Sequence, residues 1–249
     1  MNIGMYQNAA SLTALERLED AVSQNISASQ VPGYKERIVN FSSQDSGQFN
    51  LGSDGNGGPE SQQPASFPQA SNAISFKPGQ INPTGNTLDL AIQGSGFFQV
   101  QMPDGTTAYS RNGSFSLRTD GTLVNGNNYP VLGESGNPII VAQGLGPIAV
   151  TTNGQISQGE TQIGRLAVTT FADTKGLVPI EGGVLLAGPT AGASPAVNPG
   201  VVQGAIESSN VSPLFEMVNL VQVSRAYEAN QRVITNADQQ TQKTIDALG

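Results

Sequence analysis

A chain of 249 residues is long enough for one large domain or two modest ones. With 11 Lys+Arg against 19 Asp+Glu, its net charge is -8. Basic residues are therefore too few for a broad nucleic-acid-binding surface. The chain has no Cys and no His, which removes disulfides, thiolate nucleophiles, the commonest general base and the commonest metal ligands. We expect no enzyme, no cofactor and no metal site.

The remaining composition indicates a turn-rich protein with a limited core. Apolar residues make up 37%, and the chain has 30 Gly and 15 Pro. Charged residues are only 12%, about half the usual share, so much of the surface is uncharged and suits packing against other protein. No apolar run reaches about 18 residues, and the first 20 residues lack the basic and apolar regions of a signal peptide. We expect neither a membrane span nor a cleaved signal.

The N-terminal segment, from Ile3 to about Ser29, has the apolar spacing of a helix. Its apolar positions follow steps of three and four: Met5, Ala9, Leu12, Leu15, Leu18, Val22 and Ile26. The helix should stop at Val31-Pro32-Gly33, where proline blocks propagation. An amphipathic helix of about seven turns is predicted.

The next segment, residues 37–86, is dominated by Gly, Ser, Gln, Asn and Pro, most strongly from residue 43 onward. Such a composition is typical of linkers. We expect a linker or an irregular extended region.

Residues 87–205 read as short strands between turns. The turn dipeptides are Asp104-Gly105, Asn112-Gly113, Asp120-Gly121, Asn125-Gly126 and Asn153-Gly154. Because the first three are spaced eight residues apart, they predict an antiparallel sandwich or barrel-like domain.

The C-terminal segment is the longest uninterrupted pattern. Ser212 and Pro213 resemble a helix start, and neither Gly nor Pro occurs from Leu214 to Leu248. Alternating steps of three and four define a heptad seam: Leu220, Val223, Tyr227, Asn230, Ile234, Ala237, Thr241, Thr244 and Leu248. A private core against the chain's own domain is the simpler interpretation. The polar seam residues and the length favour packing with other copies.

The fold class predicted is therefore α+β, with terminal helices forming a coiled-coil stalk around an inserted all-β domain. Residues 1–36 carry the N-terminal helix of the coiled-coil core. Residues 37–86 form the linker, 87–205 the β domain, and 206–249 the C-terminal helix of the core.

Candidate chemical sites in the β region have simpler interpretations. The Gly94-x-Gly96 pattern lacks the third Gly and the Lys of phosphate loops, so we expect a turn within a sheet. Asp89, Asp104 and Asp120 could supply a carboxylate pair for glycoside hydrolysis. Two of them begin Asp-Gly turns, which favours solvated turn residues.

Tyr34, Lys35 and Arg37 form the one local basic and aromatic cluster. With two charges, it is weak as a site for a partner or an anionic lipid. We expect a solvated helix exit.

The candidate assembly interface comprises apolar and seam positions of both helices. These are Leu12, Leu15, Leu18, Val22, Ile26, Leu220, Val223, Tyr227, Asn230, Ile234 and Leu248.

Three stretches together resemble the flagellar rod and hook axial family. Residues 22–35 are similar to its "ANNLANxxTxGFK" signature, residues 88–124 to "LDxAIxGxGFFxV…YTRxGxFxxxxxGxLV", and residues 207–230 to "LExSNVxxxxEMVxxIxxxRAYExN". The matching positions that we single out are Asn25, Gly33, Tyr34, Lys35, Gly94, Gly96, Phe97, Phe98, Asn210 and Arg225.

Departures from the family pattern bear on the subtype. Gln24 and Ser27 stand where the signature has Asn and Ala, and residues 41–60 lack a stretch expected of the distal rod. These differences favour a proximal-rod subunit.

The resemblance implies a structural subunit of the bacterial basal-body rod. Such subunits pass through the flagellar type III export apparatus and stack helically in the periplasm with copies of themselves and other rod and hook proteins. A distal-rod or hook subunit is an alternative. A secreted β-domain binding module with helical oligomerisation arms is another, and a glycosidase using only carboxylates is a third.

Overall fold

The computed structural model describes residues 3–50, 62–142, 146–180 and 182–248. The chain divides into two compact units, which alternate along the sequence. The helical unit comprises Met1–Ser27, Arg37–Ile74 and Ser212–Gly249, and the β unit comprises Ala28–Glu36 and Ser75–Val211. The chain therefore passes between the units four times.

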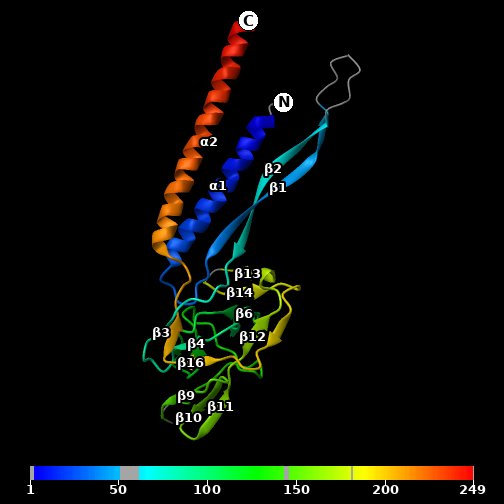
Figure 1. The fold of residues 1–249 in the computed structure, drawn as a ribbon. Coiled ribbons are helices and arrows are strands. Elements are labelled where there is room, and N and C mark those ends of the chain that lie inside the picture. The colour runs from blue at the N-terminus through cyan, green and yellow to red at the C-terminus, as the bar shows by residue number, and fades with distance from the viewer. Residues whose placement is uncertain (1–2, 51–61, 143–145, 181, 249) are drawn as a thin grey trace. The chain divides into compact units, whose positions relative to one another are not determined.

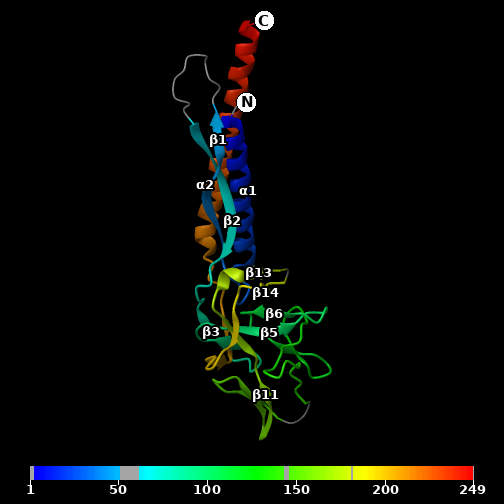
Figure 2. The same ribbon diagram turned by 90° about the vertical axis from the view of Figure 1, so that its right-hand side faces the viewer.

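The helical unit contains both expected helices. The first helix, α1, spans Ile3–Ala28, and the last, α2, spans Pro213–Leu248. Their lengths of 26 and 36 residues follow from the long stretches without Pro. Figures 1 and 2 show the two helices side by side and running in opposite directions. Two terminal helices are thus confirmed, while the coiled coil stays a prediction. Neither helix, within the described residues, is long and apolar enough to cross a bilayer.

A β-hairpin occupies most of the segment expected to be an irregular linker. Strand β1 spans Arg37–Asn50, and β2 spans Gln62–Ile74, paired antiparallel with Arg37 opposite Ile74. The prediction of an irregular linker from composition was wrong for these residues, because both strands lie at an edge of this two-stranded sheet. Edge strands tolerate Pro and polar residues that a central strand excludes.

Side chains of α1 bind the hairpin. The Arg17 guanidinium donates a hydrogen bond of 2.7 Å to the Ala70 carbonyl oxygen. The Asn25 side chain accepts from the Arg37 amide at 2.8 Å and donates to the Arg37 carbonyl at 2.9 Å. Asn25 is buried, so its amide substitutes for a strand partner at the start of β1.

The β unit consists of small antiparallel sheets rather than one sandwich or barrel. A six-stranded sheet has the order β13-β14-β6-β5-β12-β15. Its strands are β5 (Phe97–Gln101), β6 (Thr107–Ser110), β12 (Val168–Phe171), β13 (Leu177–Pro179), β14 (Leu185–Ala187) and β15 (Ala193–Pro195). A three-stranded sheet contains β9 (Ile148–Val150), β10 (Gln155–Gln158) and β11 (Thr161–Arg165). Every pairing is antiparallel.

Three two-stranded sheets complete the described part of the unit. They pair β4 (Leu90–Ile92) with β16 (Val201–Gln203), β3 (Ile81–Pro83) with β17 (Ala205–Glu207), and β7 (Ser116–Leu117) with β8 (Leu123–Val124). A short 3₁₀-helix, η1, spans Thr174–Gly176. Residues 201–207 thus return to pair with strands formed more than 100 residues earlier.

The core of the β unit is aliphatic and aromatic. Phe98 and Val100 of β5 are fully buried, and the Phe98 ring meets Phe115 edge to face with 5.1 Å between centroids. Gly105 and Gly121 have φ values of 84° and 83°, a region that glycine occupies without strain. The expected Asp-Gly turns at both places are therefore confirmed.

Candidate functional site

A buried ionic cluster surrounds Glu207, at the end of β17. Its Oε1 lies 2.6 Å from the Lys35 ammonium and 2.8 Å from the Gly79 amide nitrogen, both of which donate to it. Its Oε2 lies 3.3 Å from Nη1 of Arg111. The side chains of Glu207, Lys35 and Arg111 are 2%, 5% and 6% exposed. Buried charges need such partners because desolvation of an unpaired ion is costly.

The sequence led us to expect Lys35 at a solvated helix exit, but the structure buries its side chain. Its ammonium also donates to the Lys77 carbonyl at 2.9 Å. Burial lowers the pKa of Lys35, and the hydrogen bond and charge of Glu207 partly oppose this shift. The prediction failed because the partner carboxylate is far away in the sequence.

Arg111 connects the cluster to the six-stranded sheet. It donates to the Gly94 carbonyl at 2.6 Å and to the Ile92 carbonyl at 3.3 Å. Its guanidinium carbon lies 5.0 Å from the centre of the Phe97 ring, which is a cation–π geometry. Desolvation lowers the pKa of Arg111, against the attraction of Glu207.

Asn210 ties the same chain segments together through backbone groups. Its side-chain oxygen accepts from the Glu36 amide at 2.8 Å, and its side-chain nitrogen donates to the carbonyls of Ser75 and Lys77. Together with Glu207, it joins three segments of the β unit, residues 28–36, 75–79 and 207–211. Each of these segments lies next to a point where the chain passes into the helical unit.

The remaining family-motif residues of the β unit lie around this cluster. The Gly33 amide donates to the Glu207 carbonyl at 2.7 Å, and Gly33 has a φ of 70°. A Cβ there would overlap the backbone of Arg111 and Asn112. Gly94 is exposed and Gly96 buried, both in the turn that the sequence predicted between β4 and β5. Of the motif residues, Gly33, Gly94 and Phe97 thus contact members of the Glu207 cluster directly.

Two members of the cluster, Glu207 and Arg111, were not among the residues singled out from the sequence. Both occur in the motif blocks. The sequence did contain a signal for them. Only 12% of the residues are charged, so a charged residue within a motif block is a candidate for a specific ion pair.

Each helix has a more covered face, called here its inner face, and a more exposed face, called its outer face. Among the candidate assembly positions, Val22 and Val223 are buried, at 3% and 5% exposed. Half-buried positions are Leu12, Leu15, Leu18, Ile26, Leu220, Tyr227, Asn230 and Ile234. The Leu248 side chain is not among those that the structure describes. The seam is therefore the more covered face of α2, and its role in assembly stays a prediction.

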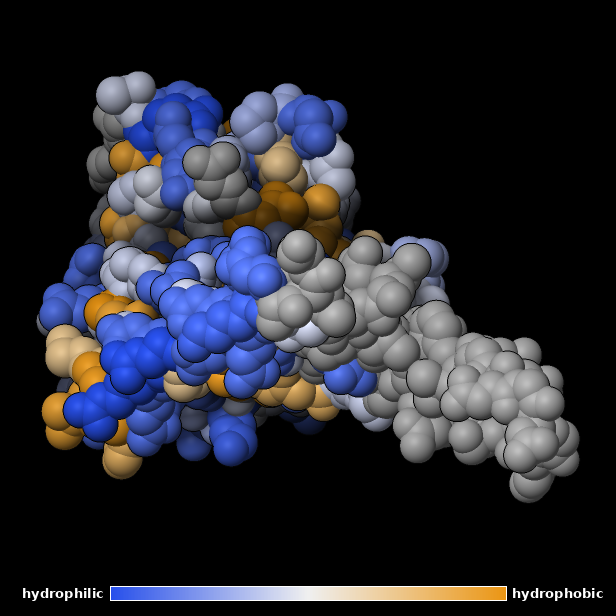
Figure 3. Space-filling model, turned by 90° about the horizontal axis from the view of Figure 1, so that it is seen from above, coloured by the Kyte–Doolittle hydropathy of each residue, from blue (hydrophilic) through white to orange (hydrophobic). Residues whose placement is uncertain are grey.

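The beginning of α2 exposes several large apolar side chains. Leu214 and Phe215 are each 71% exposed, and Met217, Val218 and Val221 are 53%, 49% and 52% exposed. In Figure 3, hydrophobic residues in orange reach the surface among polar residues in blue. These exposed apolar side chains make the beginning of α2 a candidate contact surface.

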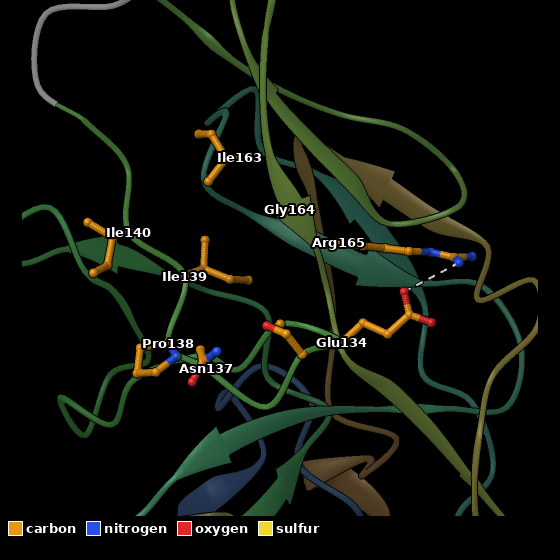
Figure 4. Close-up of a pocket in the computed structure, with 10 residues that line it drawn as sticks. Glu134, Asn137, Pro138, Ile139, Ile140, Ile163, Gly164 and Arg165 are labelled. Carbon is orange, nitrogen blue, oxygen red and sulfur yellow. Dashed lines mark ion pairs between the residues drawn. The ribbon is translucent and has the colours of Figure 1, made fainter.

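A hollow of about 430 Å³ lies on the β unit beside β11. Figure 4 shows Pro138, Ile139, Ile140 and Ile163 around it, with an ion pair of 3.6 Å between Glu134 and Arg165. Glu134 is the single carboxylate in this lining, whereas glycoside hydrolysis uses two.

The three aspartates considered for catalysis serve the backbone and local side chains. Asp104 and Asp120 are exposed and accept hydrogen bonds from the amides of Thr106 and Thr122, each at 2.9 Å. Asp89 is buried and accepts from Thr84 and Asn86. Among the described residues, no group of acids could hold a metal ion.

The features of the site are therefore those of a structural protein: a buried junction and an apolar helix face. Comparison with known proteins agrees. Residues 91–158 match the model of the flagellar hook protein FlgE/F/G D1 domain, and residues 202–247 match that of the flagellar basal body rod FlgEFG protein C-terminal region.

Individual relatives extend the match to the whole chain. The chain is 30% identical over 252 residues to the flagellar basal-body rod protein FlgF of Rhizobium meliloti, covering 100% of this chain and 99% of the relative. It is 34% identical to FlgF of Caulobacter vibrioides, covering 71% and 72%. With FlgG of Buchnera aphidicola the identity is 37%, covering 66% of each chain.

This chain belongs to the flagellar basal-body rod protein family. It is a structural subunit of the rod, in the basal body of the bacterial flagellum.

Proposed function

We propose that the chain is a proximal-rod subunit, exported by the flagellar type III apparatus, that assembles helically in the periplasm through its terminal helices. Its partners are copies of itself and other axial proteins. The helices α1 and α2 supply the coiled-coil core. The observation that carries this proposal is the match of residues 202–247 to the rod C-terminal model, because these residues include nearly all of α2.

The geometry of α2 supports assembly through this helix. Its 36 residues extend over roughly 50 Å at 1.5 Å per residue. Most seam positions are half-buried, whereas large apolar side chains elsewhere on the helix are exposed. A subunit whose helix leaves this much apolar surface exposed gains free energy when a neighbour covers it.

Complementation tests the proposal. In a strain lacking this chain, the unaltered chain should restore swimming and should co-purify with basal bodies at the level of the proximal rod. Failure to restore swimming, or recovery only with the hook, would contradict it.

A seam variant tests the role of the helices. Tyr227→Asp should abolish assembly, because it introduces a carboxylate at a half-buried seam position without a partner. The matched control is Ala226→Asp, at the exposed neighbouring position, which should swim normally. If the Tyr227→Asp variant swims as well as the Ala226→Asp control, the seam has no role in assembly.

A further inference from the structure

The outer face of α2 has its own heptad spacing, distinct from the seam. Leu214, Val218 and Val221 are followed at the same alternating steps by Arg225, Glu228 and Arg232. All six are exposed, and Glu228 forms an i,i+4 ion pair of 3.8 Å with Arg232. On a helical wheel this stripe lies about 180° from the seam. It is apolar over its first two turns and then charged.

The outer face of α1 has the same spacing and the opposite character. Ala9, Thr13, Glu16, Asp20, Ser23 and Ser27 follow steps of four and three, and all are exposed. Small residues occupy both ends of the stripe, and two acids occupy its centre. Where the α2 stripe has large side chains and arginines, the α1 stripe has small side chains and carboxylates.

Two of the three hydroxyl groups of the α1 stripe donate hydrogen bonds within the helix. The Thr13 hydroxyl donates to the Ala9 carbonyl at 3.2 Å, and the Ser27 hydroxyl donates to the Ser23 carbonyl at 2.9 Å. Because the Ser27 donor is already satisfied within the helix, an apolar side chain packed against it leaves no hydrogen bond unmade.

We propose that the outer face of α2 docks against the outer face of α1 of a second copy of this chain. When the stripes are aligned antiparallel with Arg225 opposite Glu16, two turns further along each helix Val218 lies opposite Ser23. Leu214 and Val218 then pack on Ser27 and Ser23, and Arg225 meets Glu16. Asp20 lies opposite Val221, one turn from Arg225, so the same arginine can also reach this carboxylate. Paired charges offset the repulsion between two chains that each carry a net charge of -8.

The direction of the helices fits a growing assembly. Within one chain α1 and α2 are antiparallel (Figures 1 and 2). Two copies with the same orientation therefore also bring α2 of one antiparallel to α1 of the other. This contact joins two different surfaces, so it leaves a free surface at each end and can repeat. The inference rests on the proposed assembly of the rod and names the surfaces used.

The absence of Cys from the sequence allows a direct test by disulfide cross-linking. Cells lacking the unaltered chain would produce two variants together, one with Ser23→Cys and one with Val218→Cys. Basal bodies from swimming cells would be oxidised and separated without reductant. Because each chain holds one thiol, a product at twice the chain mass of 25.7 kDa reports a contact between copies.

The proposal expects this product with the mixed pair and its loss when Asn219→Cys replaces Val218→Cys. Asn219 is also exposed, but points about 100° away around the helix. A product with Val218→Cys alone, and none with the mixed pair, would indicate two α2 faces meeting and would overturn the proposal.

Swimming separates this inference from the proposed function. Swimming cells without the mixed product would overturn the docking faces and leave the rod assignment standing. Cells that fail to swim even with the unaltered chain would overturn the rod assignment. If the Cys variants do not assemble, charge reversal decides: Arg225→Glu should reduce swimming, and Glu16→Arg in the same chain should restore it. Absence of this rescue would overturn the proposed register.

Discussion

Replacing Glu207 by Gln should destabilise the β unit strongly. The substitution keeps the shape of the side chain and an acceptor for the Gly79 amide. It removes the negative charge that faces Lys35 and Arg111, both almost completely buried. Loss of one partner from a buried ion pair typically costs about 3–5 kcal/mol. Since domains are stable by about 5–15 kcal/mol, the substitution removes about a fifth or more of the free energy of unfolding.

The matched control is Glu134→Gln on the same unit. Glu134 also pairs with an arginine, Arg165, but their side chains are 60% and 33% exposed. An exposed pair contributes about 0–1 kcal/mol, so this variant should unfold close to the unaltered protein.

Hydrogen exchange of the Phe98 and Val100 amides in increasing urea would measure both variants. These residues lie in β5, at the centre of the core, and report the β unit independently of the helices. Equal losses in the two variants would refute the reasoning that burial makes the Glu207 pair important. A triple variant, Lys35→Met, Arg111→Met and Glu207→Leu, should be more stable than Glu207→Gln, because no charge remains buried alone.

Three further predictions concern the backbone and one tyrosine. Gly113→Ala should cost about 1–3 kcal/mol, because its Cβ would overlap the Leu90 carbonyl. Gly126→Ala, which has open space around it, is the control in the same urea experiment. Asn25→Ala should lower the stability of the helical unit by about 1–3 kcal/mol by removing both bonds to Arg37, and unchanged thermal unfolding by circular dichroism would contradict this. Burial raises the pKa of Tyr109 above its ordinary value of 10.0, so absorbance titration should show a late-ionising tyrosine that is missing in Tyr109→Phe. The stability linked to its protonation is complete below pH 10.0 and is lost as the pH rises through the raised pKa; a Tyr109→Phe variant equally sensitive to alkali would contradict the assignment.

The parts of the fold that the sequence predicted are those determined by local patterns. The apolar spacing and the absence of Pro define α1 and α2 because a helix is stabilised by contacts three and four residues apart. Turns such as Asp104-Gly105 were predictable for a related reason, since the required backbone conformation depends on the residues in the turn itself. The hairpin β1–β2 was missed because its strands pair at edges and need no alternating apolar pattern.

The buried cluster of Glu207, Lys35 and Arg111 was the part of the site hardest to predict from the sequence. Tyr34, Lys35 and Arg37 looked like a weak surface cluster when considered locally. The burial of Lys35 depends on Glu207, which strand pairing of β17 with β3 brings into place. No periodicity within one segment reports such a contact.

The pairing of Lys35 with Glu207 also constrains the order in which the chain can fold. These residues are separated by 172 positions, and the strands of residues 201–207 pair with partners at residues 81–92. Contacts of such long sequence separation form late, because the loop-closure entropy must be lost before they contribute. A chain emerging N-terminus first therefore lacks the anion for Lys35 and Arg111 until four-fifths of it has appeared. The β unit of this chain therefore becomes complete only when β17, one of its last strands, is available to pair with β3.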